Sequence, residues 1–197
     1  GGTVGASDSL LGLVTEDKPK ALLEIAGKTM VQWVLDAIAA TDRVDNVIII
    51  GLDPQHSLNC GKKAIHYIPS SGGIFENVVA GATKIIKINP DSKLTMWVSA
   101  DIPLLTAEML NWFLDKIGET DHDFYYQVIN KRVMEGRFHG SRRTYTRLKG
   151  KTVCGGDVSA FSTAIASDAH PVWGKIASAR KSVARQAALV GLWPLIL

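Results

Sequence analysis

The chain has 197 residues, of which 46% are hydrophobic and 21% are charged. These proportions are typical of a globular protein, and the length predicts one domain over residues 1–197 with a sizeable apolar core. No run of about 18 apolar residues is present, which argues against a membrane partner. A formal net charge of +3 is too small to indicate a nucleic-acid-binding protein.

The two ends and the two cysteines set further expectations. The sequence opens on Gly1-Gly2 rather than Met and closes on an apolar stretch, Ala187 to Leu197, so we expect native sequence beyond both ends. That stretch is too short to span a bilayer, and it fits either a homodimer interface or part of a core helix. Cys60 and Cys154 form no C-x-x-C pair, which favours a reducing, cytoplasmic compartment over a disulfide or zinc framework.

Segments with helical periodicity alternate with short apolar runs. The expected elements, in chain order, are a loop over 1–20, a helix over 30–38, strands over 47–52 and 64–68, a helix over 74–88, a strand over 94–99, a helix from an N-cap at Thr106 to Ile117, strands over 124–129, 145–148 and 153–161, and a helix over 171–192. Alternation of this kind indicates βαβ units. The sequence therefore predicts an α/β fold, a three-layer α/β/α sandwich with a mainly parallel sheet and strand 94–99 at its centre.

Two acidic residues stand at the ends of expected strands. Asp101 follows strand 94–99, and Asp157 enters a later strand directly after Gly155-Gly156. Ligands of open parallel sheets bind outside the carboxyl ends of the strands, where a carboxylate can hold Mg²⁺. The alternatives are that Asp101 caps the turn before Pro103 and that the two glycines form a hairpin turn. Two carboxylates that converge on one point would favour the magnesium site.

Two further segments could bind phosphate. The opening glycines are followed by Lys18-Pro19-Lys20, and loop amides with a lysine can surround phosphate groups, although no Walker A pattern is present. Between Glu135 and Asp157 lie six basic residues and no acid, namely Arg137, Arg142, Arg143, Arg147, Lys149 and Lys151. This basic run is either a solvated face or an anion site.

Taken in order, these segments resemble the MobA-like nucleotidyltransferase superfamily, which has a GT-A-like Rossmannoid fold. Gly1-Gly2, Lys18 to Leu23 and Ile25 to Met30 resemble its N-terminal signature. Glu76 to Gly81 resembles the helix start that faces the nucleotide base, and Ser99 to Leu104 resembles the metal-aspartate motif. The resemblance implies a nucleotide-diphospho-sugar transferase-like fold and an Mg²⁺-dependent enzyme, which transfers NMP from a nucleoside triphosphate to a phosphorylated small-molecule acceptor and releases pyrophosphate.

The resemblance also implies roles for particular residues. Gly1, Gly2 and Lys20 would bind the nucleotide, Gly73 and Asn77 would lie near its base, and Asp101 and Asp157 would hold Mg²⁺, with Lys20 and Asp101 catalytic. We assign Arg143 and Arg147, from the basic run, to the phosphate of the acceptor.

The sequence departs from the family pattern in two places. The family usually carries an arginine in the phosphate loop, but residues 3–13 contain no Arg or Lys, and the first strand, expected just before Gly1, is absent. Two alternatives therefore stay open. One is a nucleotide-binding module without catalytic activity, and the other is a glycosyltransferase on the same fold that uses a nucleotide-sugar.

Overall fold

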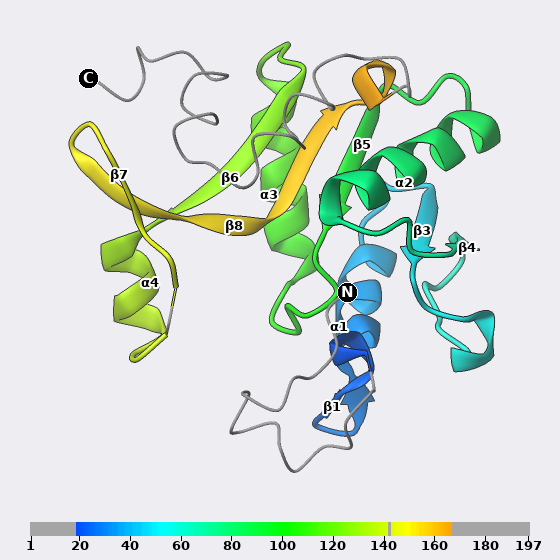
Figure 1. Ribbon diagram of the computed structural model, residues 1–197, viewed down its shortest axis with the longest axis horizontal. Coiled ribbons are helices and arrows are strands. Elements are labelled where there is room, and N and C mark those ends of the chain that lie inside the picture. Colours follow the sequence, from blue (N-terminus) through cyan, green and yellow to red (C-terminus); the bar gives the residue numbers. More distant parts are fainter. Residues whose placement is uncertain (1–18, 142, 167–197) are drawn as a thin grey trace.

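A computed structural model describes residues 19–141 and 143–166, apart from the side chain of Phe75. Its elements are η1 (Lys20–Leu22), β1 (Glu24–Ile25), β2 (Lys28–Thr29), α1 (Met30–Ala39), β3 (Asn46–Ile50), η2 (Pro54–His56), β4 (Ala64–Ile68), α2 (Ile74–Ile88), β5 (Leu94–Val98), α3 (Ala107–Gly118), β6 (Phe124–Asn130), α4 (Lys131–Arg137), β7 (Thr146–Leu148), β8 (Lys151–Ser162) and η3 (Thr163–Ala166) (Figure 1). The helix expected over 171–192, together with Gly1 and Gly2, lies outside the described residues.

Side-chain caps and a tight turn explain where several elements begin. The Thr106 hydroxyl accepts a hydrogen bond from the Met109 amide at 3.3 Å, as the sequence predicts, and Thr29 caps α1 in the same way. Between β1 and β2, Ala26 and Gly27 have φ values of 52° and 78°. Two successive positive φ values are those of a type I′ hairpin turn, so the family-like segment over residues 25–30 is a hairpin that leads into α1.

Helices cover both faces of the sheet that contains β8 (Figure 1). Val158 and Ala160 of β8 pack in the core cluster formed with α1 and α3. Phe161, which points the other way, packs with Val78 and Ala82 of α2. Because successive side chains of a strand point to opposite faces, this alternation places α1 and α3 in one layer and α2 in the other. The predicted α/β class and sandwich arrangement are confirmed.

The sheet is mixed rather than strictly parallel. The pair β3 and β4 is parallel, whereas β8 pairs antiparallel with β5, β6 and β7. The turn between β7 and β8 includes Gly150, whose φ is 70°. Gly155-Gly156 lies within β8, so these two glycines do not form the hairpin turn that the sequence left open.

A cavity of about 570 Å³ separates β3 from β5. Every residue of both strands lines it, with side chains of α1 and α2 completing its walls. Among the described strands β3 pairs only with β4 and β5 only with β8, so each has one edge without a strand partner. Among the described strands β5 is therefore at the edge of its sheet, and not at the centre as the sequence predicts.

Two remaining expectations concern the cysteines and the membrane. Cys60 and Cys154 are both free and buried, in agreement with the prediction that they form no disulfide. Within the described parts of the chain, no helix has both the length and the apolar character needed to cross a bilayer.

Candidate functional site

Asp101 is an exposed residue in the loop that connects β5 to α3. The Ser99 hydroxyl donates a 2.5 Å hydrogen bond to Asp101 Oδ1. This contact orients the carboxylate just beyond the carboxyl end of β5. The sequence analysis did not assign Ser99 a role, although a hydroxyl two residues before an acid in a loop is a recognisable signal for such a contact.

Asp157 meets the same end of β5 from the neighbouring strand. The Ser99 amide donates a 2.9 Å hydrogen bond to the main-chain oxygen of Asp157, which continues the β5–β8 ladder one step past the pair Val98 and Val158. Strand β8 runs antiparallel to β5, so the first residues of β8 that pair with β5 lie beside the carboxyl end of β5. The two acids therefore share one edge, which we call the acidic edge (Ser99, Asp101 and Asp157).

Arg143 binds the Asp157 carboxylate with both arms of its guanidinium group. Nη2 lies 2.6 Å from Oδ2 and Nη1 lies 3.5 Å from Oδ1. The hydrogen bond to Asp157 raises the pKa of Arg143; burial opposes this rise, and the charges of Asp157 and Asp101 add to it. The carboxylates of Asp101 and Asp157 therefore both act electrostatically on the Arg143 guanidinium group. This supports the conclusion that the two carboxylates lie close to each other.

Gly155 and Gly156 have a packing role next to the acidic edge. A Cβ at Gly155 would collide with the Tyr126 hydroxyl, and one at Gly156 would collide with the side-chain amide of Gln127. Both of these side chains come from β6, whose register with β8 shifts between Tyr126 and Val128. The glycines thus let β6 side chains lie across β8, which explains their occurrence without a ligand.

The donors at the acidic edge are compatible with one Mg²⁺ ion. In the described residues no group of three or more His, Cys, Asp or Glu side chains could hold a metal. Magnesium bound with a nucleotide commonly uses only one or two carboxylates, with waters and phosphate oxygens as the other ligands. The two carboxylates of the acidic edge match that number, but a cation could take both oxygens of Asp157 only by replacing Arg143.

Lys20 is the first residue of η1, which packs against α1. Its main-chain oxygen accepts a 3.1 Å hydrogen bond from the Leu23 amide, and the hairpin formed by β1 and β2 follows. Pro19, which precedes Lys20, lines the cavity between β3 and β5 together with Ser99 and Ala100. The segments that carry Lys20 and Asp101 therefore adjoin one cavity.

Gly73 and Asn77 form the start of α2. Gly73 is the N-cap residue, and its oxygen accepts a 3.0 Å hydrogen bond from the Asn77 amide. The Asn77 side chain accepts a 2.7 Å hydrogen bond from the Ser71 amide, which fixes the preceding loop. Asn77 also lines the cavity that Pro19 and Ala100 line, so the predicted base-binding segment adjoins the same space.

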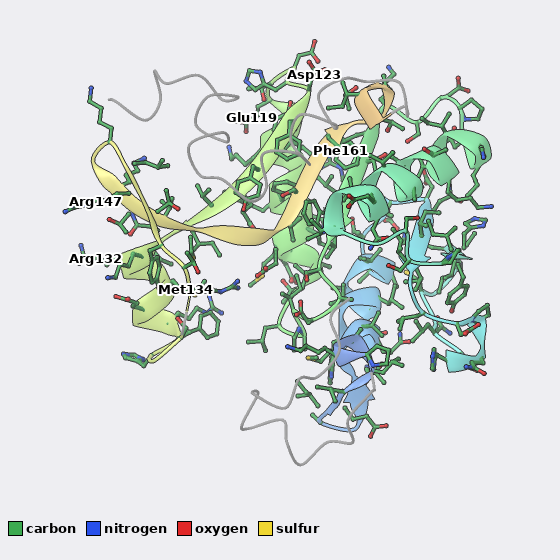
Figure 2. All side chains as sticks on the ribbon, viewed as in Figure 1. Glu119, Asp123, Arg132, Met134, Arg147 and Phe161 are labelled. Atoms are coloured by element: carbon green, nitrogen blue, oxygen red, sulfur yellow. The ribbon has the colours of Figure 1, made fainter. Side chains whose placement is uncertain are left out.

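Arg147 lies apart from these residues. It belongs to β7 and stands opposite Thr152, five residues before Asp157 on β8, which corresponds to about 17 Å along the strand. Figure 2 shows Arg147 and Arg132 on the outer side of the lobe made by α4, β7 and the first half of β8. Of the two arginines assigned to the acceptor, the structure brings only Arg143 to the acidic edge.

Comparison with solved structures identifies the fold. A hypothetical transferase from Thermus thermophilus is 29% identical, with a TM-score of 0.74 over 100% of this chain and 78% of that one. A 4-diphosphocytidyl-2C-methyl-D-erythritol synthase from Anaerococcus prevotii is 12% identical, with a TM-score of 0.57 over 79% of this chain and 67% of that one. CMP:2-keto-3-deoxy-manno-octonic acid synthetase, solved with CTP, is 12% identical, with a TM-score of 0.57 over 90% of this chain and 78% of that one.

The fold is therefore the nucleotide-diphospho-sugar transferase-like fold of nucleotidyltransferases. The family model for the MobA-like NTP transferase domain matches residues 12–192, and the chain belongs to this family. No curated protein matches the chain. The resemblance found in the sequence is confirmed at the level of family and fold.

Proposed function

We propose that this protein transfers a nucleoside monophosphate from a nucleoside triphosphate to a phosphorylated small molecule. An oxygen of the acceptor phosphate forms a bond to the α-phosphorus, the bond from that phosphorus to the bridging oxygen breaks, and pyrophosphate leaves. The observation that carries the proposal is the meeting of Asp101 and Asp157 at the end of β5, in a chain of the MobA-like NTP transferase family.

Asp101 and Asp157 hold the Mg²⁺ ion in this proposal. Mg²⁺ would supply charge neutralisation and alignment of the phosphates, the two main requirements of phosphoryl chemistry. Ser99 keeps the Asp101 carboxylate turned toward the edge through its 2.5 Å hydrogen bond. The function of these three residues is positioning and charge, and no covalent intermediate on the protein is required.

Lys20 neutralises charge on the triphosphate in this proposal, and Gly1 and Gly2, which lie outside the described residues, are assigned to the nucleotide on the resemblance alone. A lysine supplies a compact positive charge, and its main chain is held in the turn η1. The absence of Arg and Lys from residues 3–13 gives Lys20 a larger share of this task than it would have beside a phosphate-loop arginine.

Gly73 and Asn77 lie near the base, and Arg143 and Arg147 are assigned to the acceptor phosphate. The position of Asn77 on the wall of the cavity supports the first assignment. Arg143 is supported by its position at the acidic edge, whereas Arg147 could contribute only at longer range, through the general positive field of the lobe.

The proposal is tested by incubating the protein with each nucleoside triphosphate, Mg²⁺ and a panel of phosphorylated sugars and alcohols. The proposal is supported if pyrophosphate is released only when the acceptor is present and if this release is lost in Asp101→Asn. Nucleotide binding without turnover would identify a binding module instead. Turnover of nucleotide-sugars without pyrophosphate would identify a glycosyltransferase.

A further inference from the structure

Arg143 reaches the acidic edge from a different part of the molecule. It lies on the connection between α4, which ends at Arg137, and β7, which begins at Thr146. These two elements belong to the outer lobe, on the left of Figure 1, whereas Asp157 is on the stretch of β8 next to β5. The ion pair thus ties the lobe to the acidic edge.

The pair is strong in geometry but open to solvent. Both arms of the guanidinium group face the carboxylate, and the Arg143 and Asp157 side chains are 38% and 28% exposed. Ion pairs with this exposure contribute little free energy, because water screens the charges. Because the Asp157 side chain is partly exposed, another cation can reach its oxygens from solvent.

A guanidinium group and a divalent cation compete for the same oxygens of Asp157. The fork of Arg143 uses both oxygens, and Asp101, the other proposed metal ligand, also acts on the Arg143 charge. A cation with two charges between the two carboxylates would both take the ligand atoms and repel the guanidinium group. A cation that takes both oxygens of Asp157 therefore cannot bind while both arms of Arg143 are in place.

The segment around Arg143 carries groups suited to an anion. In the described residues, the Ser141 hydroxyl and the Tyr145 hydroxyl are buried and have no hydrogen-bond partner. The Lys131 ammonium lies 5.2 Å from the centre of the Tyr145 ring and 3.6 Å from Glu135 Oε1, with which it forms an ion pair. Ser141 and Tyr145 stand two residues before and two residues after Arg143 in the chain, and hydroxyl donors can bind a phosphate monoester together with a guanidinium group.

We propose that Arg143 is an internal counter-ion of Asp157 that leaves when a divalent cation binds, and that the released guanidinium group then binds the acceptor phosphate with Ser141 and Tyr145. This inference rests on the proposed metal site at Asp101 and Asp157. It makes binding ordered, with the metal and nucleotide first and the acceptor second. If the acceptor arrives before the metal, Arg143 is still paired with Asp157 and cannot bind the acceptor phosphate.

The first test measures metal affinity in the absence of nucleotide and turnover. The protein is titrated with Mn²⁺, and the free ion is followed by electron paramagnetic resonance. Removing the competing charge in Arg143→Gln should tighten Mn²⁺ binding by about two- to fivefold, the size of a partly exposed ion pair. Arg132→Gln, an exposed arginine of the same lobe, is the matched control and should match the wild type. Unchanged or weaker binding in Arg143→Gln, with an unchanged melting temperature, would overturn the inference.

Asp157→Asn separates this inference from the metal site itself. If Asp157→Asn binds Mn²⁺ as tightly as the wild type, the proposed metal site is wrong and the competition at Asp157 falls with it. If Asp157→Asn loses Mn²⁺ while Arg143→Gln is unchanged, the metal site stands and only the exchange is wrong.

The second test uses phenyl phosphate as a monoester probe in calorimetric titrations with and without Mn²⁺. Mn²⁺ should strengthen phenyl phosphate binding in the wild type, and most of this coupling should be lost in Arg143→Gln. An equal gain in both proteins would show that the probe binds the metal directly, and would overturn the transfer of Arg143 to the phosphate.

Discussion

The acidic edge and the core between α1 and α3 are built in opposite ways. Leu35 and Leu110 of this core are 1% and 0% exposed, so their burial stabilises the fold. At the edge, Asp101 is exposed and is oriented by one hydroxyl, and Asp157 is bound by a partly exposed arginine. The difference indicates that the core determines stability and that the edge is available for binding, so the two properties should respond to separate substitutions.

The largest expected effect at the nucleotide end of the site is that of Lys20→Ala. Turnover should fall by about two orders of magnitude or more, on the scale of losing one charge-stabilising donor. Affinity for the triphosphate should fall less, because the metal and the main-chain amides remain. Steady-state kinetics and nucleotide titrations measure the two quantities. Lys62→Ala, an exposed lysine of the loop before β4, is the control. Equal losses in both variants would remove Lys20 from the site.

The core should show the converse behaviour. Leu110→Ala is expected to lower the free energy of unfolding by about 2–5 kcal/mol, because it leaves a cavity in a fully buried position. Urea denaturation measures this change, and Leu148→Ala, at a position that is 40% exposed, should stay within about 0.5 kcal/mol of the wild type. Mn²⁺ affinity of the folded Leu110→Ala protein should equal that of the wild type. A large change in that affinity would show that core and edge are coupled.

The two arginines assigned to the acceptor should differ in effect. Arg143→Ala should raise KM for the acceptor by about tenfold or more, the equivalent of one hydrogen bond to a charged group. Arg147→Ala should raise it less, because Arg147 lies beside Thr152 at the far end of the lobe. Initial-rate measurements over a range of acceptor concentrations compare the two. A larger effect for Arg147 would mean that the acceptor extends along the lobe.

The smallest expected effect is that of an ion pair outside both regions. Burial tends to raise the pKa of Asp36, but hydrogen bonds from Lys28 and Gln32 outweigh it, so the pKa lies below the ordinary value of 3.8. The pair therefore stabilises the folded state above about pH 3.8, and this contribution is lost as the pH falls through the lowered pKa. Melting temperatures of the wild type and Asp36→Asn should differ slightly at pH 7 and converge near pH 2. A constant difference over this range would contradict the shift.

The sequence predicted correctly the helices and helix caps whose signal lies in neighbouring residues. Helix α2 has the predicted bounds, Ile74 to Ile88, because its apolar side chains recur at helical spacing, and Thr106 caps α3 as expected. Helix α4 was not predicted, since one buried residue, Met134, gives a helix of seven residues no visible periodicity. Strand β8 was predicted over 153–161 and runs from Lys151 to Ser162, and side chains of β6 explain the two glycines within it.

The acidic edge was only partly predictable. The meeting of Asp101 and Asp157 was expected from the positions of two acids at strand ends, although β8 turned out to be antiparallel to β5. The pairing of Arg143 with Asp157 could not be predicted, because it depends on how the lobe folds back toward β8. The same long-range geometry separates Arg143 from Arg147, two residues that look equivalent in the sequence.

The most direct test of the account is Mn²⁺ binding by the wild type, Asp101→Asn and Asp157→Asn in the presence of a nucleoside triphosphate. The account predicts that the wild type binds Mn²⁺ with the nucleotide, that both variants lose this binding, and that their melting temperatures stay close to that of the wild type. Wild-type Mn²⁺ affinity in Asp101→Asn, together with a large fall in melting temperature, would contradict the account. That result would mean that Asp101 stabilises the loop after β5 and holds no metal.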